Sequence, residues 1–166
     1  YFPEHYYNPI IYSNIQDIGY INGIINVPSE VKFIKALDAF VKSKDKEIKD
    51  KYDWWKFSVL NEHRDSIYIP YFDFNDNQRF RPDFIFWFCK DKDYRIVFVD
   101  PKSYQDTKWV AKAEGFRKIF KDKEFIYKGY RVTVDLKLFG KPGFEAGLYK
   151  DFWTDNIDSI FGLYKK

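Results

Sequence analysis

The stretch Arg81–Ser103, which reads RPDFIFWFCKDKDYRIVFVDPKS, decides the fold. Phe84–Phe88 is a run of aromatic and β-branched residues, and Arg95–Val99 is a second apolar run. The polar segment Cys89–Asp93 between them is typical of a turn. Both runs are almost continuously hydrophobic, as in strands that are covered on both faces. The stretch therefore predicts an antiparallel pair of buried strands.

Acidic residues stand at one end of each predicted strand. Asp83 comes just before the first strand and Asp100 just after the second. Because the start of one antiparallel strand lies beside the end of the next, we expect the two carboxylates to meet at one edge of the sheet. Lys102 follows Asp100 by two residues, so in extended chain both side chains point to the same face.

Two carboxylates and a nearby carbonyl are oxygen ligands of the kind that Mg²⁺ prefers. An ammonium group beside them can orient a water molecule and offset the charge that develops on a phosphate under attack. The pattern therefore predicts a metal-dependent site for phosphodiester hydrolysis. Acid-x-Lys occurs five times in the chain, whereas Pro-Asp occurs once, at Pro82–Asp83. The copy at Asp100–Lys102 is selected because it alone closes a strand that follows a strand headed by Pro-Asp.

Upstream, the sequence predicts a helix over Glu30–Lys44 with Ser29 as its N-cap. Apolar residues recur along one face of this helix at Phe33, Ile34, Leu37, Phe40 and Val41. Glu30 lies on the same face at the helix start, so we expect its carboxylate to point inward. Residues 1–28, rich in Asn, Pro and Gly with short β-like pieces, are interpreted as an irregular lead-in.

Between this helix and the deciding stretch, Trp54–Leu60 and Ile67–Phe72 are rich in β-forming residues and are separated by the polar segment Asn61–Ser66. This arrangement predicts a hairpin. The segment Asp73–Arg81 is polar, and we expect a loop there.

Downstream, an apolar stripe predicts a second helix over Thr107–Phe120. Strict alternation predicts a strand over Tyr130–Leu138, and a short helix is expected near Asp155–Tyr164. The predicted order, helix, three strands, helix, strand, indicates an α/β fold with a mixed sheet flanked by helices. Residues 29–166 then form a single domain.

Composition fits a globular chain, because 45% of the residues are hydrophobic and 32% are charged. No segment is long and apolar enough to span a membrane, and no signal peptide is recognisable. The lone Cys89 is expected to be buried and reduced, which favours a cytoplasmic protein. Aromatic residues make up 22%, and we expect the tryptophans Trp54, Trp55, Trp87 and Trp109 to lie in the core. The chain lacks methionine, which predicts a segment of a longer protein.

The constellation resembles the PD-(D/E)xK nuclease superfamily. RPDFIFWF at Arg81–Phe88 and IVFVDPKS at Ile96–Ser103 look like the C-terminal endonuclease domain of type III restriction enzymes. The resemblance extends to SEVKFI at Ser29–Ile34 and EHRDSIYIPYF at Glu62–Phe72, and it covers roughly residues 29–103. It implies a restriction-endonuclease-like core and a prokaryotic, cytoplasmic setting.

By this resemblance, Asp83 and Asp100 are metal ligands and Lys102 is the catalytic lysine. Glu30 corresponds to the acid that many members carry on the first helix, and Glu62 is its rival. The metal is Mg²⁺, for which Mn²⁺ is expected to substitute. The implied partners are double-stranded DNA, an ATP-driven helicase or translocase module, and a modification or specificity subunit. The chain itself has no phosphate-binding Gly-x4-Gly-Lys-Ser/Thr loop.

Two other interpretations remain open from the residues alone. In the first, the domain has a nuclease fold that has lost activity and serves as a DNA-binding or assembly module. In the second, it is a structural interaction domain of a larger enzyme, and this interpretation predicts no affinity for divalent metals. His63 is interpreted as a solvated loop residue, with a contact to a DNA phosphate as the alternative.

Overall fold

The computed structural model describes residues 11–12, 24–25, 27–60, 66–73, 76–101, 108–140 and 147–163. Its helices are α1 (Pro28–Lys51), α2 (Trp109–Ile119), α3 (Ile157–Phe161) and the 3₁₀ helix η1 (Gly147–Phe152). The strands are β1 (Ile11–Tyr12), β2 (Ile24–Ile25), β3 (Trp54–Val59), β4 (Ile69–Asp73), β5 (Asp76–Phe80), β6 (Phe84–Lys90), β7 (Asp93–Pro101), β8 (Glu124–Tyr127), β9 (Tyr130–Phe139) and β10 (Trp153–Thr154).

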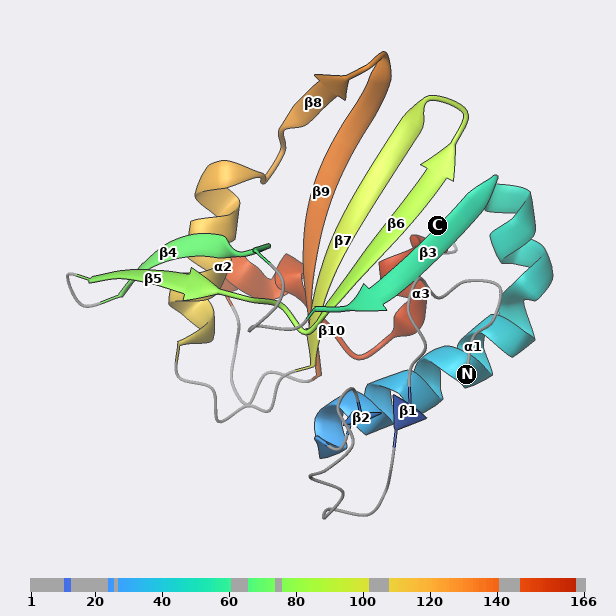
Figure 1. Ribbon diagram of the computed structural model, residues 1–166, viewed down its shortest axis with the longest axis horizontal. Helices are drawn as coiled ribbons and strands as arrows, with labels where there is room; N and C mark the ends of the chain where they lie inside the picture. The colour runs from blue at the N-terminus through green and yellow to red at the C-terminus, as the bar shows by residue number, and fades with distance from the viewer. Residues whose placement is uncertain are drawn as a thin grey trace.

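The main sheet has the strand order β10-β9-β7-β6-β3, and β8 pairs with β9 beside this path. Strands β3, β6 and β7 run antiparallel to their neighbours in this group, whereas β7 and β9 are parallel and are connected through α2. Figure 1 shows these strands fanning out from a common lower edge. The protein is therefore an α/β fold with a mixed central sheet, as the sequence predicts.

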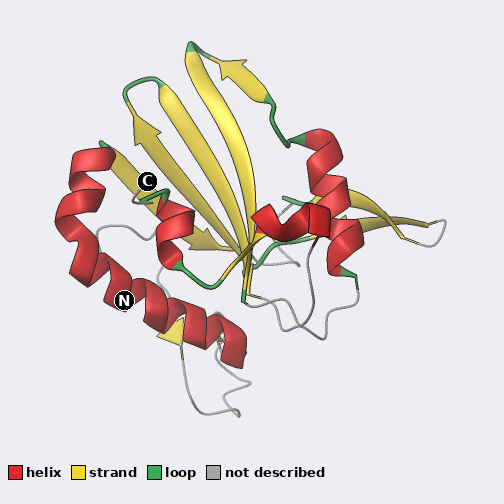
Figure 2. Cartoon of the chain, turned by 180° about the vertical axis from the view of Figure 1, so that it is seen from behind, coloured by secondary structure: helices red, strands yellow, loops and turns green. Residues whose placement is uncertain are grey.

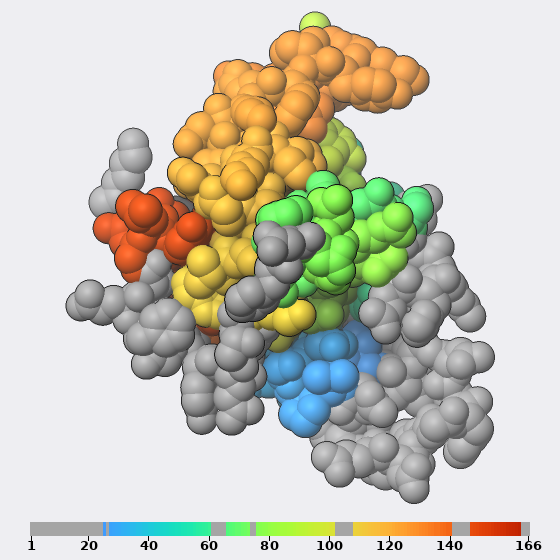
Figure 3. All heavy atoms as spheres, turned by 90° about the vertical axis from the view of Figure 1, so that its left-hand side faces the viewer, coloured from blue at the N-terminus to red at the C-terminus, as the bar shows by residue number. Residues whose placement is uncertain are grey.

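Each face of the main sheet carries its own hydrophobic cluster. The first cluster joins α1 and α3 to the sheet through Phe33, Phe86 and Phe161, and Figure 2 shows both helices on that side. The second cluster joins α2 to the other face through Phe98, Phe116 and Leu136. The small sheet β4–β5 packs beside α2 in this second layer, as Figure 3 shows.

Helix α1 begins slightly earlier than predicted and continues past Lys44. The N-cap residue is Val27 rather than Ser29, and no side chain caps the helix. Pro28 explains the shift, because proline has the φ angle of a first helical position and needs no amide partner there. At Lys44 the φ angle of −121° and the ψ angle of 17° mark a kink, and the second part of the helix buries Ile48.

The predicted hairpin between Trp54–Leu60 and Ile67–Phe72 is wrong. Strand β3 pairs with β6 instead, and β4 pairs with β5 in a separate sheet. The predicted polar loop Asp73–Arg81 contains strand β5, whose sequence DNQRF has little intrinsic preference for strands. Pairing with β4 and burial of Phe80 stabilise this strand despite its composition.

The deciding stretch folds as predicted. Strands β6 and β7 pair antiparallel from Phe84–Val99 to Lys90–Asp93, around a turn at Asp91 and Lys92. Cys89 lies in β6, where it is buried as expected. Helix α2, strand β9 and helix α3 also confirm the predicted elements within a few residues. The edge strand β8 has no counterpart in the sequence analysis.

The tryptophans divide between core and surface. Trp55 and Trp109 are buried as predicted, and Trp87 is half-buried. The prediction of a core position was wrong for Trp54, which is 39% exposed. Strand alternation explains the difference, since Trp54 and Trp55 point to opposite faces of β3 and only one of those faces is covered there.

Helices of the described residues are too short or too polar to cross a membrane.

The contact between α2 and β4 yields a first prediction. A Cβ atom added at Gly115 would lie 2.5 Å from the Pro70 carbonyl oxygen and 2.6 Å from the Tyr71 Cβ. Gly115→Ala should therefore destabilise the fold by about 1–3 kcal/mol through overpacking, although alanine has the higher helix propensity. Urea unfolding followed by circular dichroism measures the change. The exposed Lys118→Ala on the same helix is the control and should stay within about 0.5 kcal/mol; an unchanged Gly115→Ala variant would contradict this packing.

Candidate active site

The β6–β7 register brings the two predicted acids together. The last registered pair at this end of the strands is Phe84 with Val99. Continuing by one residue places Asp83 opposite Asp100, where Cα atoms of antiparallel strands are about 4.5–5.5 Å apart. The backbone of Asp83 is also held by β3, because the amide of Leu60 donates a hydrogen bond of 2.8 Å to its carbonyl oxygen.

Alternation along β7 determines which face the acids occupy. Val97 and Val99 belong to the cluster under α1, and Phe98 belongs to the cluster under α2. Asp100 therefore points toward the α2 side of the sheet, and its register partner Asp83 shares that side. The expectation that these two carboxylates meet at one edge of the sheet agrees with the observed register.

The two acids differ in their exposure. Asp100 is 1% exposed, at a strand end between apolar residues, whereas Asp83 is partly exposed. A buried carboxylate costs desolvation free energy, which a structural role as a simple turn residue would not require. Burial of Asp100 at the end of a central strand is the unusual feature of this site.

Glu30 lies in the first turn of α1, near the same edge of the sheet. One turn further along the helix, the Phe33 ring lies 5.0 Å from that of Phe84 and 4.9 Å from that of Phe139. Glu30 is partly buried, and the inward orientation of its carboxylate stays a prediction. Its helix covers the opposite face of the sheet from the acid pair, so Glu30 approaches the edge from the other layer.

Among the residues that the structure describes, no three acidic, histidine or cysteine side chains are grouped closely enough to hold a metal ion. The described geometry thus brings Asp83 and Asp100 together but does not join Glu30 to them. Lys102, Glu62 and His63 lie outside the described residues, and the predictions for them stay predictions.

Arg81 is a candidate site residue to which the sequence analysis assigned no role. Its Nε atom is buried and has no hydrogen-bond partner among the described residues. It stands two positions before Asp83, in the short link between β5 and β6. The sequence feature that could have identified Arg81 is its position immediately before Pro82–Asp83, which puts a basic residue next to the expected carboxylates.

Comparison with protein families identifies the chain. The family model described as YagJ family matches residues 24–136, which is more than half of the sequence. The chain belongs to the YagJ family. The region by which this YagJ family member is recognised runs from β2 into β9 and contains Glu30, Asp83, Asp100 and Lys102. Comparisons with curated proteins and with solved structures returned no significant match.

Burial of Asp100 yields a second prediction. In buffer with EDTA, Asp100→Asn should unfold at the same temperature as this YagJ family member or at a higher one. An amide of the same shape costs less to bury than a carboxylate. Differential scanning calorimetry measures the shift.

Asp135→Asn is the matched control on neighbouring strand β9. Asp135 points to the other face and pairs with Arg95 at 3.1 Å, so its loss should lower stability by about 0.5–1 kcal/mol. A marked destabilisation by Asp100→Asn would show instead that the charged form of Asp100 stabilises the fold.

Proposed function

We propose that this YagJ family member is a metal-dependent DNA endonuclease domain of the PD-(D/E)xK type, which hydrolyses phosphodiester bonds. The observation that carries the proposal is the β6–β7 register, which, continued by one residue beyond Phe84 and Val99, sets Asp83 opposite the buried Asp100. Simple structural acids are rarely buried at a strand end, whereas metal ligands regularly are.

The order of the elements supports the proposal. From α1 to β9, leaving out the small sheet β4–β5 and the edge strand β8, the chain runs α1, β3, β6, β7, α2, β9. This order resembles the helix, three strands, helix and strand expected of a restriction-endonuclease-like core. The acid pair matches the place where that core carries its acids, with Asp83 just before the second of these strands and Asp100 near the end of the third.

The donor set fits a hard divalent cation. Asp83 and Asp100 offer carboxylate oxygens from adjacent strands, and backbone carbonyls at the strand end can add further oxygen ligands. Glu30 is proposed as a third acid, with Glu62 as the alternative. Mg²⁺ bound there would neutralise charge on the scissile phosphate and favour ionisation of the attacking water.

Two basic residues of the chain are assigned the remaining roles, which are to position the water and to bind the phosphate. Lys102, two residues after Asp100, holds the attacking water in line with the scissile bond and offsets negative charge on the phosphorus centre. Arg81, two residues before Asp83 and only partly buried as a residue, supplies a guanidinium donor to a phosphate oxygen. Attack on phosphorus then leaves a 5′-phosphate and a 3′-hydroxyl.

Double-stranded DNA is the proposed substrate of the wider system. An ATP-driven helicase or translocase and a modification or specificity subunit are the proposed partners, as the resemblance to type III restriction enzymes implies. A single domain has one such site, so cutting both strands requires two copies or two events.

Cleavage of supercoiled plasmid DNA tests the proposal and is the third prediction. In Mg²⁺ or Mn²⁺ the chain should nick the plasmid, and Asp100→Ala or Lys102→Ala should reduce the rate by at least about 100-fold. Removing groups that act in the transition state has effects of this size. Agarose gel electrophoresis over time gives the rates, and circular dichroism checks folding.

Lys49→Ala is the matched control for this assay. Glu47 and Lys49 have the same acid-x-Lys spacing but lie exposed on α1. This variant should cleave like the parent. Nicking that survives in a folded Asp100→Ala variant would rule out the proposed site.

Metal binding provides the fourth prediction and does not depend on cleavage. At a Mg²⁺ concentration ten times the dissociation constant, the chain should gain about 1.4 kcal/mol of stability, which raises the midpoint of thermal unfolding by about 3–6 °C. Asp83→Ala and Asp100→Ala should lose this gain, whereas Asp135→Ala should keep it. A gain that persists in both acid variants would place the metal elsewhere.

The alternative is a nuclease fold that has lost activity and serves DNA binding or assembly. Metal-dependent nicking that disappears in Lys102→Ala would exclude this candidate.

A further inference from the structure

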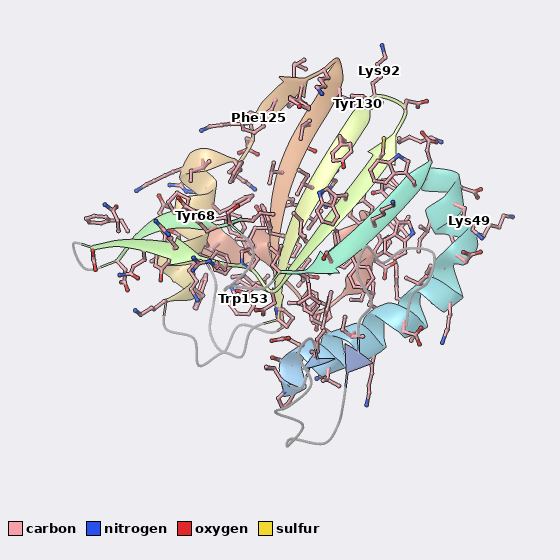
Figure 4. All side chains as sticks on the ribbon, in the orientation of Figure 1. Lys49, Tyr68, Lys92, Phe125, Tyr130 and Trp153 are labelled. Atoms are coloured by element: carbon pink, nitrogen blue, oxygen red, sulfur yellow. The ribbon has the colours of Figure 1, made fainter. Side chains whose placement is uncertain are left out.

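A groove lined by aromatic rings crosses the main sheet at the end remote from Asp100. It is formed by Trp54, Trp87, Tyr94, Phe125, Tyr127 and Tyr130, which we call the aromatic groove. Two adjoining hollows of about 730 and 540 Å³ make up the groove and share the rings of Trp54, Trp87 and Tyr94. Figure 4 labels Phe125 and Tyr130 near the tip of the β8–β9 hairpin.

The rings form a continuous row across three strands. Trp54 on β3 contacts Tyr94 on β7 at 5.4 Å between ring centroids, and Tyr94 contacts Tyr130 on β9 at 6.5 Å. Tyr127 is 64% exposed, and Trp54, Phe125 and Tyr130 are each about 40% exposed. Contiguous exposed apolar patches of this kind are uncommon on monomeric proteins and are associated with interaction and ligand-binding sites.

The charges of the groove favour an anionic ligand. Lys56 and Lys128 line it, and none of the described lining residues is acidic. Nearby carboxylates are engaged by bases: Asp53 accepts from Lys90 at 2.8 Å, and Asp93 accepts from Arg131 at 2.6 Å. Both interactions lower the pKa values of these carboxyl groups, so they remain paired with cations at neutral pH.

The groove and the acid pair occupy the same face of the sheet. Along β7, Tyr94, Phe98 and Asp100 alternate onto the α2 side, and six residues of strand separate Tyr94 from Asp100 by about 20 Å. Helix α2 and the sheet β4–β5 cover the middle of that face and leave its far end open among the described residues.

Resting on the proposed nuclease function, we infer that the aromatic groove binds single-stranded DNA, whose unpaired bases stack on its rings while Lys56 and Lys128 face the phosphates. Stacking requires bases with accessible faces, which duplex DNA does not offer. A second copy of the chain is a poorer occupant, because the groove would bring its own lysines against like charges. The inferred substrate is thus DNA with an unpaired stretch near the scissile bond.

Fluorescence anisotropy of labelled oligo(dT) of 16 nucleotides, titrated with the 166-residue chain in EDTA, tests this inference without cleavage. The oligonucleotide should bind more tightly than a duplex of equal length. Trp54→Ala and Tyr130→Ala should each weaken binding by about 5- to 100-fold, because each removes one stacking ring. Phe72→Ala removes a ring on β4 that is even more exposed, at 59%, but lies outside the groove, and this variant should bind like the parent.

The outcomes separate this inference from the proposed function. Absence of oligo(dT) binding, preference for the duplex, or equal loss with Phe72→Ala would overturn the groove inference even where plasmid cleavage is observed. A dimer that Trp54→Ala dissociates in light scattering, without DNA binding, would overturn it in favour of a self-interface. Binding that depends on Trp54 and Tyr130, in a chain that does not cleave plasmid, would uphold the groove and refute the nuclease.

Discussion

The antiparallel pairing of β6 with β7 is the constraint on which the rest of the structure depends. Both strands lie inside the main sheet and are apolar on both faces, so each needs a helical layer on each side. Helices α1 and α3 cover one side, and α2 with β4–β5 covers part of the other. Continued by one residue, the same pairing sets Asp83 opposite Asp100, because Asp83 directly precedes Phe84 and Asp100 directly follows Val99.

Predictability followed the strength of the local signal. Strands β6, β7 and β9 and helices α1 and α2 were predictable because their apolar residues repeat with the period of the element. The partner of β3 was not predictable in this way. Neighbouring strands usually pair, but the segment between β3 and β6 forms its own small sheet on α2, and this tertiary contact decides the pairing.

The candidate site was predictable to a similar degree. The proximity of Asp83 to Asp100 was predictable from the antiparallel direction of a hairpin, because this prediction requires only that two consecutive strands pair. The approach of Glu30 depends on how α1 packs against Phe84 and Phe139, and periodicity does not contain that information. The exposure of Trp54 escaped prediction for the same reason, because it depends on where the layer over β3 ends.

Strand β7 carries residues of the aromatic groove at one end and of the acid pair at the other. Side chains alternate between faces, so inserting or deleting one residue between Tyr94 and Asp100 would turn one of the two sites to the opposite face. The number of residues between Tyr94 and Asp100 is thus fixed by the requirement that the groove and the acid pair share one face, whereas the turn at Asp91 and Lys92 carries no such requirement. The pleat of the backbone sets the spacing between the two ends of the strand.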